Sequence, residues 1–219
     1  MTARELISTT IAPLSTSDTG KYALEHMVDY HVRHLPIVLD GQLLGLVSED
    51  DIMQHNPSLP ISAYNLSLTR PAVKDTAHYY DIIHLMSEFQ LTLIPVVDAR
   101  EEYLGTIVQQ DLLMAFAKIA SLADAGSVIV LETAQHNYSL AEIARIVESE
   151  NAVILSSYVT SIPESMQIEI TIKISKQNIG AIVSAFQRFN YTIKGAFAEN
   201  QYQESLQSNY DAFVHYLNV

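Results

Sequence analysis

The 219-residue sequence predicts an α+β protein in two parts. The first observation is an internal repeat, because an apolar pattern within residues 1–60 recurs within residues 61–122. The second is a change of pattern after residue 126, where strand-like and helix-like segments follow one another in a new order. Hydrophobic residues make up 48% of the chain, which is ordinary for folded proteins and sufficient for two small cores.

The repeat is carried by residues 21–39, "KYALEHMVDYHVRHLPIVL", and residues 80–98, "YDIIHLMSEFQLTLIPVVD". The two segments match at an offset of 59, and one residue inserted at the following turn moves the offset to 60. Turns tolerate insertions best, so the offset changes where we expect it to change. The matching pairs are Met27 and Met86, Tyr30 and Phe89, Pro36 and Pro95, Val38 and Val97, Leu44 and Leu104, Gly45 and Gly105, and Asp51 and Asp111.

Both repeats predict the same local structure. Apolar residues at helical spacing predict a helix that ends before Pro36, since proline disfavours helix in the residue before it. "LPIVL" predicts a strand, Asp40-Gly41 a tight hairpin, and "LLGLVS" the returning strand, after which a helix begins near Ser48. One such unit cannot cover its own sheet, so we expect the two copies to stack.

The second part predicts the order βαββαβ after a linker at residues 121–126. Ser139 and Glu142 are spaced as a helix capping box. Leu140, Met166 and Phe189 are expected on the buried faces of their elements. The predicted strands are "SVIVLETA", "AVILSSYV", "MQIEITIKI" and "YTIKGAFA", and the predicted helices are "YSLAEIARIVESEN" and "NIGAIVSAFQRFN". An added amphipathic helix is predicted at the end, with Leu206, Tyr210, Phe213, Val214 and Leu217 at helical spacing.

Composition argues against several functions. Twelve Lys and Arg stand against 25 Asp and Glu, and the formal charge of −13 repels phosphate backbones and anionic membranes, so neither nucleic acid nor membrane is expected as a partner. The absence of cysteine excludes disulfides and Cys-type zinc sites. No apolar run approaches the roughly 18 residues of a membrane span, and the N-terminus has no signal-peptide pattern, so we expect the cytoplasm. No catalytic motif or convincing metal-ligand set occurs, so we expect no enzyme.

The stretch "GLVSEDDI", residues 45–52, ends a predicted strand in a hydroxyl and three acids. Ser48 and Asp51 have the spacing of a helix cap. In one interpretation they only stabilise the helix, by about 1 kcal/mol, and bind no ligand. Alternatively, the pair also binds a ligand: N–H groups at a helix start can receive phosphate, and a carboxylate can accept hydrogen bonds from vicinal hydroxyls. The sequence leaves both interpretations open.

The two repeats resemble the CBS domain, and residues 1–122 are similar to a tandem CBS pair, or Bateman module. The residues that carry the resemblance are "RHLPIV" followed by "GLVSEDDI", and "LIPVV" followed by "GTIVQQDL". Residues 127–219 resemble, in topology and domain order, a ferredoxin-like ACT-type regulatory domain, as in the acetoin-utilisation protein B family. The first strand–helix turn, "ETAQHNYSLAE", lacks the glycine that amino-acid-binding ACT domains usually carry.

The resemblance implies a nucleotide site in the first repeat. Ser48 would contact ribose or phosphate, and Asp51 would accept from ribose hydroxyls. His34, two residues before the strand proline, would reach phosphate, with Arg33 beside it. A strand entering the repeat, from Ile11 to Leu14, would contact the base. The full set implied for the site is Ser48, Asp51, His34, Ile11, Ala12, Leu14 and Pro36, with Asp111 in the second copy.

The second copy is degraded, because Val108 replaces the hydroxyl residue and Leu93 replaces the basic residue. At most one full site is therefore expected. The implied ligand is an adenine nucleotide (AMP, ADP or ATP) or S-adenosylmethionine, and no cofactor is required. We predict a non-catalytic regulatory protein that changes conformation on binding, forms a homodimer and acts on a separate protein. The alternative is a ligand-free interaction scaffold whose CBS site has decayed.

Overall fold

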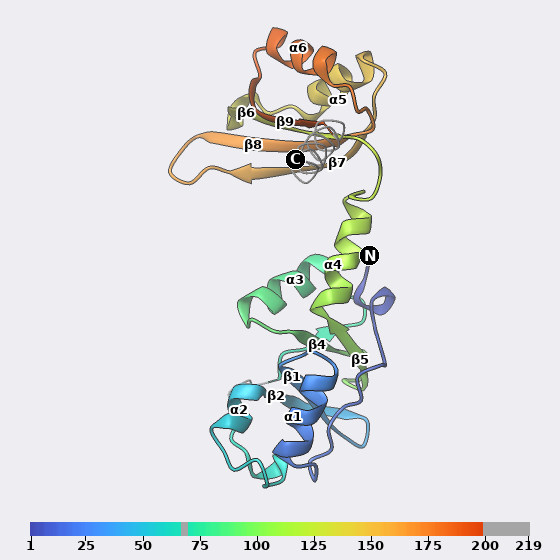
Figure 1. Cartoon of the computed structure of the whole chain (residues 1–219), viewed down its shortest axis with the longest axis vertical. Helices are drawn as coiled ribbons and strands as arrows, with labels where there is room; N and C mark the ends of the chain where they lie inside the picture. The colour runs from blue at the N-terminus through green and yellow to red at the C-terminus, as the bar shows by residue number, and fades with distance from the viewer. Residues whose placement is uncertain (67–69, 199–219) are drawn as a thin grey trace, which may run out of the picture. The chain divides into compact units, whose positions relative to one another are not determined.

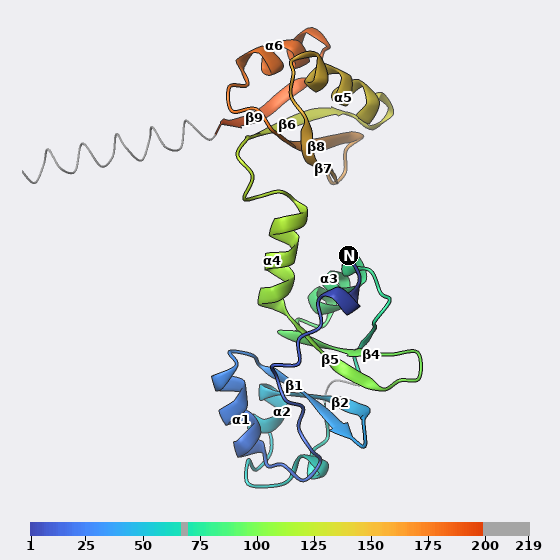
Figure 2. The ribbon, with the colours of Figure 1, turned by 90° about the vertical axis from the view of Figure 1, so that its right-hand side faces the viewer.

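The computed structural model describes residues 1–66 and 70–198, and the chain divides into two compact units, Met1–Ala115 and Phe116–Val219 (Figures 1 and 2). Each unit has its own hydrophobic core. The mixed α+β class is confirmed by helices and small sheets in both units. The domain boundaries expected at residues 122 and 127 stay a prediction, and the predicted helix with Leu206 and Leu217 lies outside the described residues.

The first repeat has the predicted order of elements. After a short 3-10 helix, η1 (Ala3–Glu5), it contains α1 (Gly20–Asp29), β1 (His34–Leu39), β2 (Gln42–Ser48) and α2 (Glu49–Met53). Strands β1 and β2 pair antiparallel through the predicted hairpin. Asp40 and Gly41 both have positive φ angles, 51° and 80°, which is the backbone that a tight primed hairpin turn requires.

The second repeat follows the same plan. Its elements are η2 (Ile61–Ala63), β3 (Val73–Lys74), α3 (Tyr79–Glu88), β4 (Leu93–Val97), β5 (Tyr103–Val108) and α4 (Gln109–Ile119). Short β3 runs parallel to β4, and β5 pairs antiparallel with β4. The register shifts after Val96 in β4 as it does after Ile37 in β1, at matching positions of the two copies. The structure therefore confirms the repeat down to its irregularities.

One core joins the two repeats, as stacking requires. Leu46 and Ile52 of the first copy and Ile82 and Ile107 of the second are each 0% exposed and belong to the same apolar cluster. Burying a Leu or Ile side chain contributes about 1.5–3 kcal/mol, so neither copy could retain its stability with this face in water. The hairpins are also linked, because the Tyr103 N–H donates to the Gly41 carbonyl at 2.8 Å.

The second unit has the predicted βαββαβ order. It contains β6 (Ser127–Ala134), η3 (Gln135–Asn137), α5 (Leu140–Ser149), β7 (Ile154–Ser161), β8 (Gln167–Ile174), α6 (Gly180–Arg188) and β9 (Thr192–Ala198). The antiparallel sheet has the order β7-β8-β6-β9, which is the ferredoxin-like arrangement. Helices α5 and α6 cover one face of this sheet (Figures 1 and 2). The assignment to the ACT family in particular stays a prediction.

The core of the second unit corrects three expectations. The isoleucines of β8 from Ile168 to Ile174 are buried as expected, but Met166 is 70% exposed because it lies before the strand begins. Leu140 and Phe189 are also exposed, since they lie at the first residue of α5 and just after the end of α6. Residues at element ends follow the periodicity of the sequence but have no opposing layer to pack against.

The predicted capping box of α5 is half correct. Ser139 caps the helix, since its Oγ accepts from the Glu142 N–H at 3.2 Å. The Glu142 carboxylate, however, accepts from the Tyr191 hydroxyl at 2.9 Å. Tyr191 is only 6% exposed, and its buried hydroxyl needs an acceptor, so Glu142 ties α5 to the start of β9.

Candidate ligand cleft of the first repeat

The site begins where β2 ends, at the Ser48–Asp51 pair. Ser48 Oγ donates to Asp51 Oδ2 at 2.7 Å, the Ser48 N–H donates to the same oxygen at 3.0 Å, and the Asp51 N–H donates to Ser48 Oγ at 3.0 Å. The predicted cap is thus a complete capping box. Ser48 is 7% and Asp51 2% exposed, so neither side chain lies in bulk solvent.

The start of α2 differs from the expected phosphate-binding arrangement. The helix has only five residues. Its Glu49 N–H donates to the Arg33 carbonyl at 2.9 Å, and its Asp51 N–H donates to Ser48. These donors are therefore already engaged inside the protein, and the expectation that they would be available to a phosphate group is wrong for both of them.

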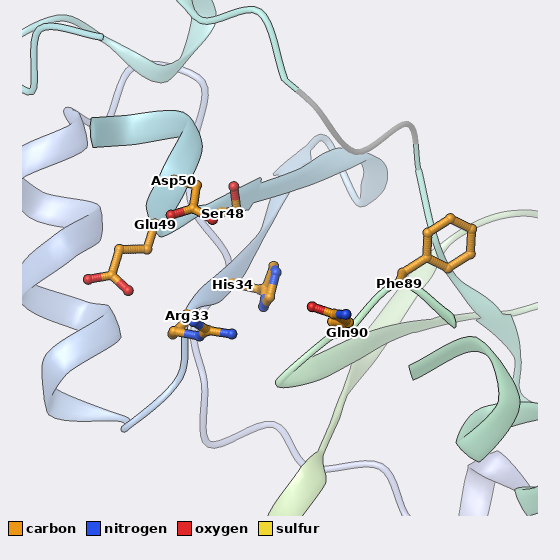
Figure 3. A pocket seen from close by; sticks show the side chains of 7 residues that line it. All are labelled: Arg33, His34, Ser48, Glu49, Asp50, Phe89 and Gln90. Carbon is orange, nitrogen blue, oxygen red and sulfur yellow. The ribbon is translucent and has the colours of Figure 1, made fainter. Parts of the chain in front are cut away.

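A cleft of about 170 Å³ lies beside this pair, between the two repeats. Arg33, His34, Ser48, Glu49 and Asp50 line it from the first repeat. Phe89 and Gln90 line it from the second, just after α3, and Figure 3 shows the Gln90 amide directed toward His34. Figure 3 also shows the Glu49 side chain extending away from His34. The volume is below the roughly 300–1,000 Å³ typical of drug-sized ligand pockets.

His34 is, like Ser48, a buried polar residue of the cleft lining, being 7% exposed. The Thr92 N–H donates to its Nδ1 at 3.3 Å, and the Thr92 hydroxyl lies 3.0 Å from the same nitrogen. The Thr92 hydroxyl can donate there because its oxygen accepts from the Arg33 N–H at 2.9 Å. This pattern makes Nδ1 the acceptor and places the ring proton on Nε2.

Burial lowers the pKa of His34 below its ordinary value of 6.5, and the neighbouring charge of Arg33 lowers it further. The carboxylates of Asp51 and Asp50 oppose this change without reversing it. The side chain is therefore neutral near pH 7. It can offer a ligand a neutral Nε2–H donor, whereas the sequence suggested a cation that reaches phosphate.

The remaining residues implied for the site lie away from the cleft lining. Ile11 and Leu14 are buried in the core, and Ala12 is exposed. The expected strand from Ile11 to Leu14 is wrong in extent: Leu14 alone bridges to β1, donating to the Pro36 carbonyl at 2.8 Å. Pro13 has no N–H, which limits pairing before Leu14. Pro36 is buried within β1.

A second cleft, of about 290 Å³, occupies the matching position of the other repeat. Val108 lies where the first cleft has Ser48, and Thr92 lies where it has Arg33. Asp111 is half-buried in α4 and does not line this cleft. Its lining residues are Tyr30, His31, Val32, Thr92, Val108, Gln109, Gln110 and Leu113. None of these described lining residues carries a carboxylate or is a Lys or Arg, which distinguishes this lining from that of the first cleft.

Sequence reasoning missed Gln90, Phe89 and Thr92 as neighbours of the first site. The repeat offset contained a signal for Phe89 and Gln90, since residues 30 and 31 match residues 89 and 90 and each pair directly follows a helix. Within the described ranges, no group of three His, Asp or Glu side chains is arranged to hold a metal ion. Over the same ranges, no helix combines the length and apolar character of a membrane span.

Comparison with known families identifies the domains of the repeat region. Residues 3–57 and 66–118 match the family described as the CBS domain, in agreement with the two structural repeats. The chain therefore carries a tandem pair of CBS domains.

Solved structures similar to this chain include a CBS domain pair/ACT domain protein from Thermotoga maritima, with 20% identity over 54% of this chain and 98% of that one, at a TM-score of 0.49. The acetoin utilization protein AcuB from Vibrio cholerae has 21% identity over 56% of this chain and 95% of its own, at a TM-score of 0.48. CBSX2, solved in complex with AMP, has 20% identity over 54% of this chain and 97% of its own, at a TM-score of 0.47.

Proposed function

We propose that this chain is a non-catalytic regulatory protein that binds an adenine nucleotide or a related adenosyl ligand in the first cleft. The observation that carries the proposal is the meeting of Ser48 and His34 from the first repeat with Gln90 from the second in one cleft. A ligand held there contacts both repeats at once. It stabilises whichever arrangement of the repeats it fits best, which is how binding becomes a signal.

The chemistry of the lining suits hydroxyl and amide recognition. His34 offers Nε2–H, Gln90 offers both a donor and an acceptor, and Ser48 can exchange its internal bond to Asp51 for one to a ribose hydroxyl. We further propose a homodimer in the cytoplasm that acts on a separate protein. The bound state would then be read by that partner through the altered arrangement of the repeats.

Thermal unfolding with added ligand tests the proposal. AMP, ADP, ATP and S-adenosylmethionine are added separately, and at least one is expected to raise the melting temperature by mass action. Ser48→Ala should abolish that rise. Ser139→Ala is the matched control: it removes a capping serine from α5, in the other unit, and should leave the response intact. A flat response of the wild-type chain to all four compounds would eliminate the proposal.

A second candidate, an interaction scaffold without ligand, is favoured by the completeness of the Ser48–Asp51 capping box. The three hydrogen bonds between Ser48 and Asp51 are internal to the protein, and the cleft is small. In this case no adenosyl compound alters the melting temperature, and Ser48→Ala only reduces stability. The two candidates are therefore separated by the ligand response and not by stability.

A further inference from the structure

The described residues that line the first cleft carry more negative than positive charge. Arg33 is the single permanent cation among the described residues that line it, whereas Glu49 and Asp50 are both acids of the lining. Asp51 lies just behind Ser48, and its field, with those of Asp50 and Arg33, reaches the His34 ring. Since the whole chain has a formal charge of −13, the surrounding field has the same sign.

The groups that commonly compensate a polyphosphate are already committed. His34 is neutral, because Nδ1 accepts from Thr92 and burial disfavours the charged ring. The Glu49 and Asp51 N–H groups donate within the protein. A ligand with several phosphates would therefore meet one guanidinium and at least two nearby carboxylates.

From this balance of charge, we propose that the first cleft selects an adenosyl ligand of low net negative charge, such as a nucleoside or its monophosphate, and rejects nucleoside di- and triphosphates. This inference rests on the proposed function and narrows its ligand class. The volume of about 170 Å³ acts in the same direction, because a small cleft accommodates a short ligand more readily than one lengthened by further phosphates.

Calorimetric titration of the full chain with adenosine, AMP, ADP, ATP and S-adenosylmethionine, without Mg²⁺ and at fixed ionic strength, tests the selection. We expect ATP to bind at least about tenfold more weakly than AMP, since repulsion grows with each phosphate charge. S-adenosylmethionine, which extends the nucleoside with a cationic group, should bind at least as tightly as ADP. Raising the salt concentration should reduce the difference in affinity between AMP and ATP, because salt screens the repulsion between the phosphates and the carboxylates.

The double variant Glu49→Gln/Asp50→Asn removes two carboxylates while leaving Ser48 and Asp51 in place. It should raise the affinity for ATP by about tenfold and change that for adenosine by less than about twofold. The matched control, Asp124→Asn/Glu148→Gln, changes the net charge equally on exposed positions of the second unit and should preserve the wild-type selection.

The outcomes separate the two claims. If ATP binds as tightly as AMP to the wild-type chain, the charge selection is wrong and the proposed function stands. Equal effects of the two double variants would show that net charge, and not the cleft, governs the selection, which also overturns the inference. If none of the five compounds binds, the proposed function fails and the inference fails with it.

Discussion

Replacing Ser48 with alanine should destabilise the first unit by about 2–3 kcal/mol. Loss of an N-cap hydroxyl alone costs about 1 kcal/mol. Ser48 Oγ also donates to the Asp51 carboxylate at 2.7 Å, and a hydrogen bond to a charged group contributes about 1.5–3 kcal/mol. Because Asp51 is 2% exposed, water cannot easily replace the lost donor. The two contributions share one hydroxyl, so they do not add in full.

The comparison with Ser139→Ala isolates the effect of the buried acid. Ser139 accepts one backbone N–H and, among the described residues, is bonded to no carboxylate, so its loss should cost about 1 kcal/mol. Amide hydrogen exchange during urea titration reports the free energy of opening for residues 1–115 and 116–198 separately. Ser48→Thr retains the hydroxyl and should recover most of the loss. If Ser48→Ala costs no more than Ser139→Ala, the bond to Asp51 contributes nothing and our account of the site is wrong.

Four further substitutions, at His34, Gly105, Gly41 and Tyr191, test other features of the structure. Burial lowers the pKa of His34 below 6.5, so the unfolded chain binds more protons at this residue than the folded chain does. The contribution of His34 to the unfolding free energy is therefore complete above pH 6.5 and is lost as the pH falls below that value. His34→Gln should flatten the decline of the wild-type unfolding free energy measured between pH 7.5 and pH 5.5. Gly105→Ala should lower the unfolding free energy measured in urea by about 2–3 kcal/mol, because its Cβ would lie 2.8 Å from the Ser8 carbonyl oxygen and the φ angle is 149°. Gly41→Ala places its Cβ in open space and should cost about 1 kcal/mol in the same assay. Tyr191→Phe should lower the stability of the second unit by about 1 kcal/mol by deleting the bond to Glu142, and an unchanged exchange rate in α5 would contradict that bond's role.

Much of the fold could be predicted because its signals are local. The Asp40-Gly41 hairpin and the Ser48 cap follow from the conformations that those residues favour, and the repeat follows from periodic apolar residues. Single elements of the second unit could be predicted in the same way, since "QIEITIKI" alternates strictly along β8. Local chemistry of this kind acts within a few residues and does not depend on how the repeats pack.

The site was less predictable because it depends on contacts between distant residues. Thr92 lies 58 residues from His34, yet it fixes the tautomer of that side chain and helps to keep it neutral. The sequence suggested a basic His34, whereas burial in the folded unit, with the neighbouring charge of Arg33, lowers the pKa of that side chain. The same holds for Gln90, which has no motif of its own and reaches the cleft by virtue of the stacking.

The shared interior of the two repeats also constrains how such a chain can diverge. Each copy supplies part of the other's apolar packing, so the centre must change in concert, while the rims of the two clefts can drift independently. Val108 and Ser48 stand at matching rims and already differ in polarity. The two clefts therefore give this internally repeated unit two chemically distinguishable faces, and a partner protein could tell one from the other without any change in the backbone.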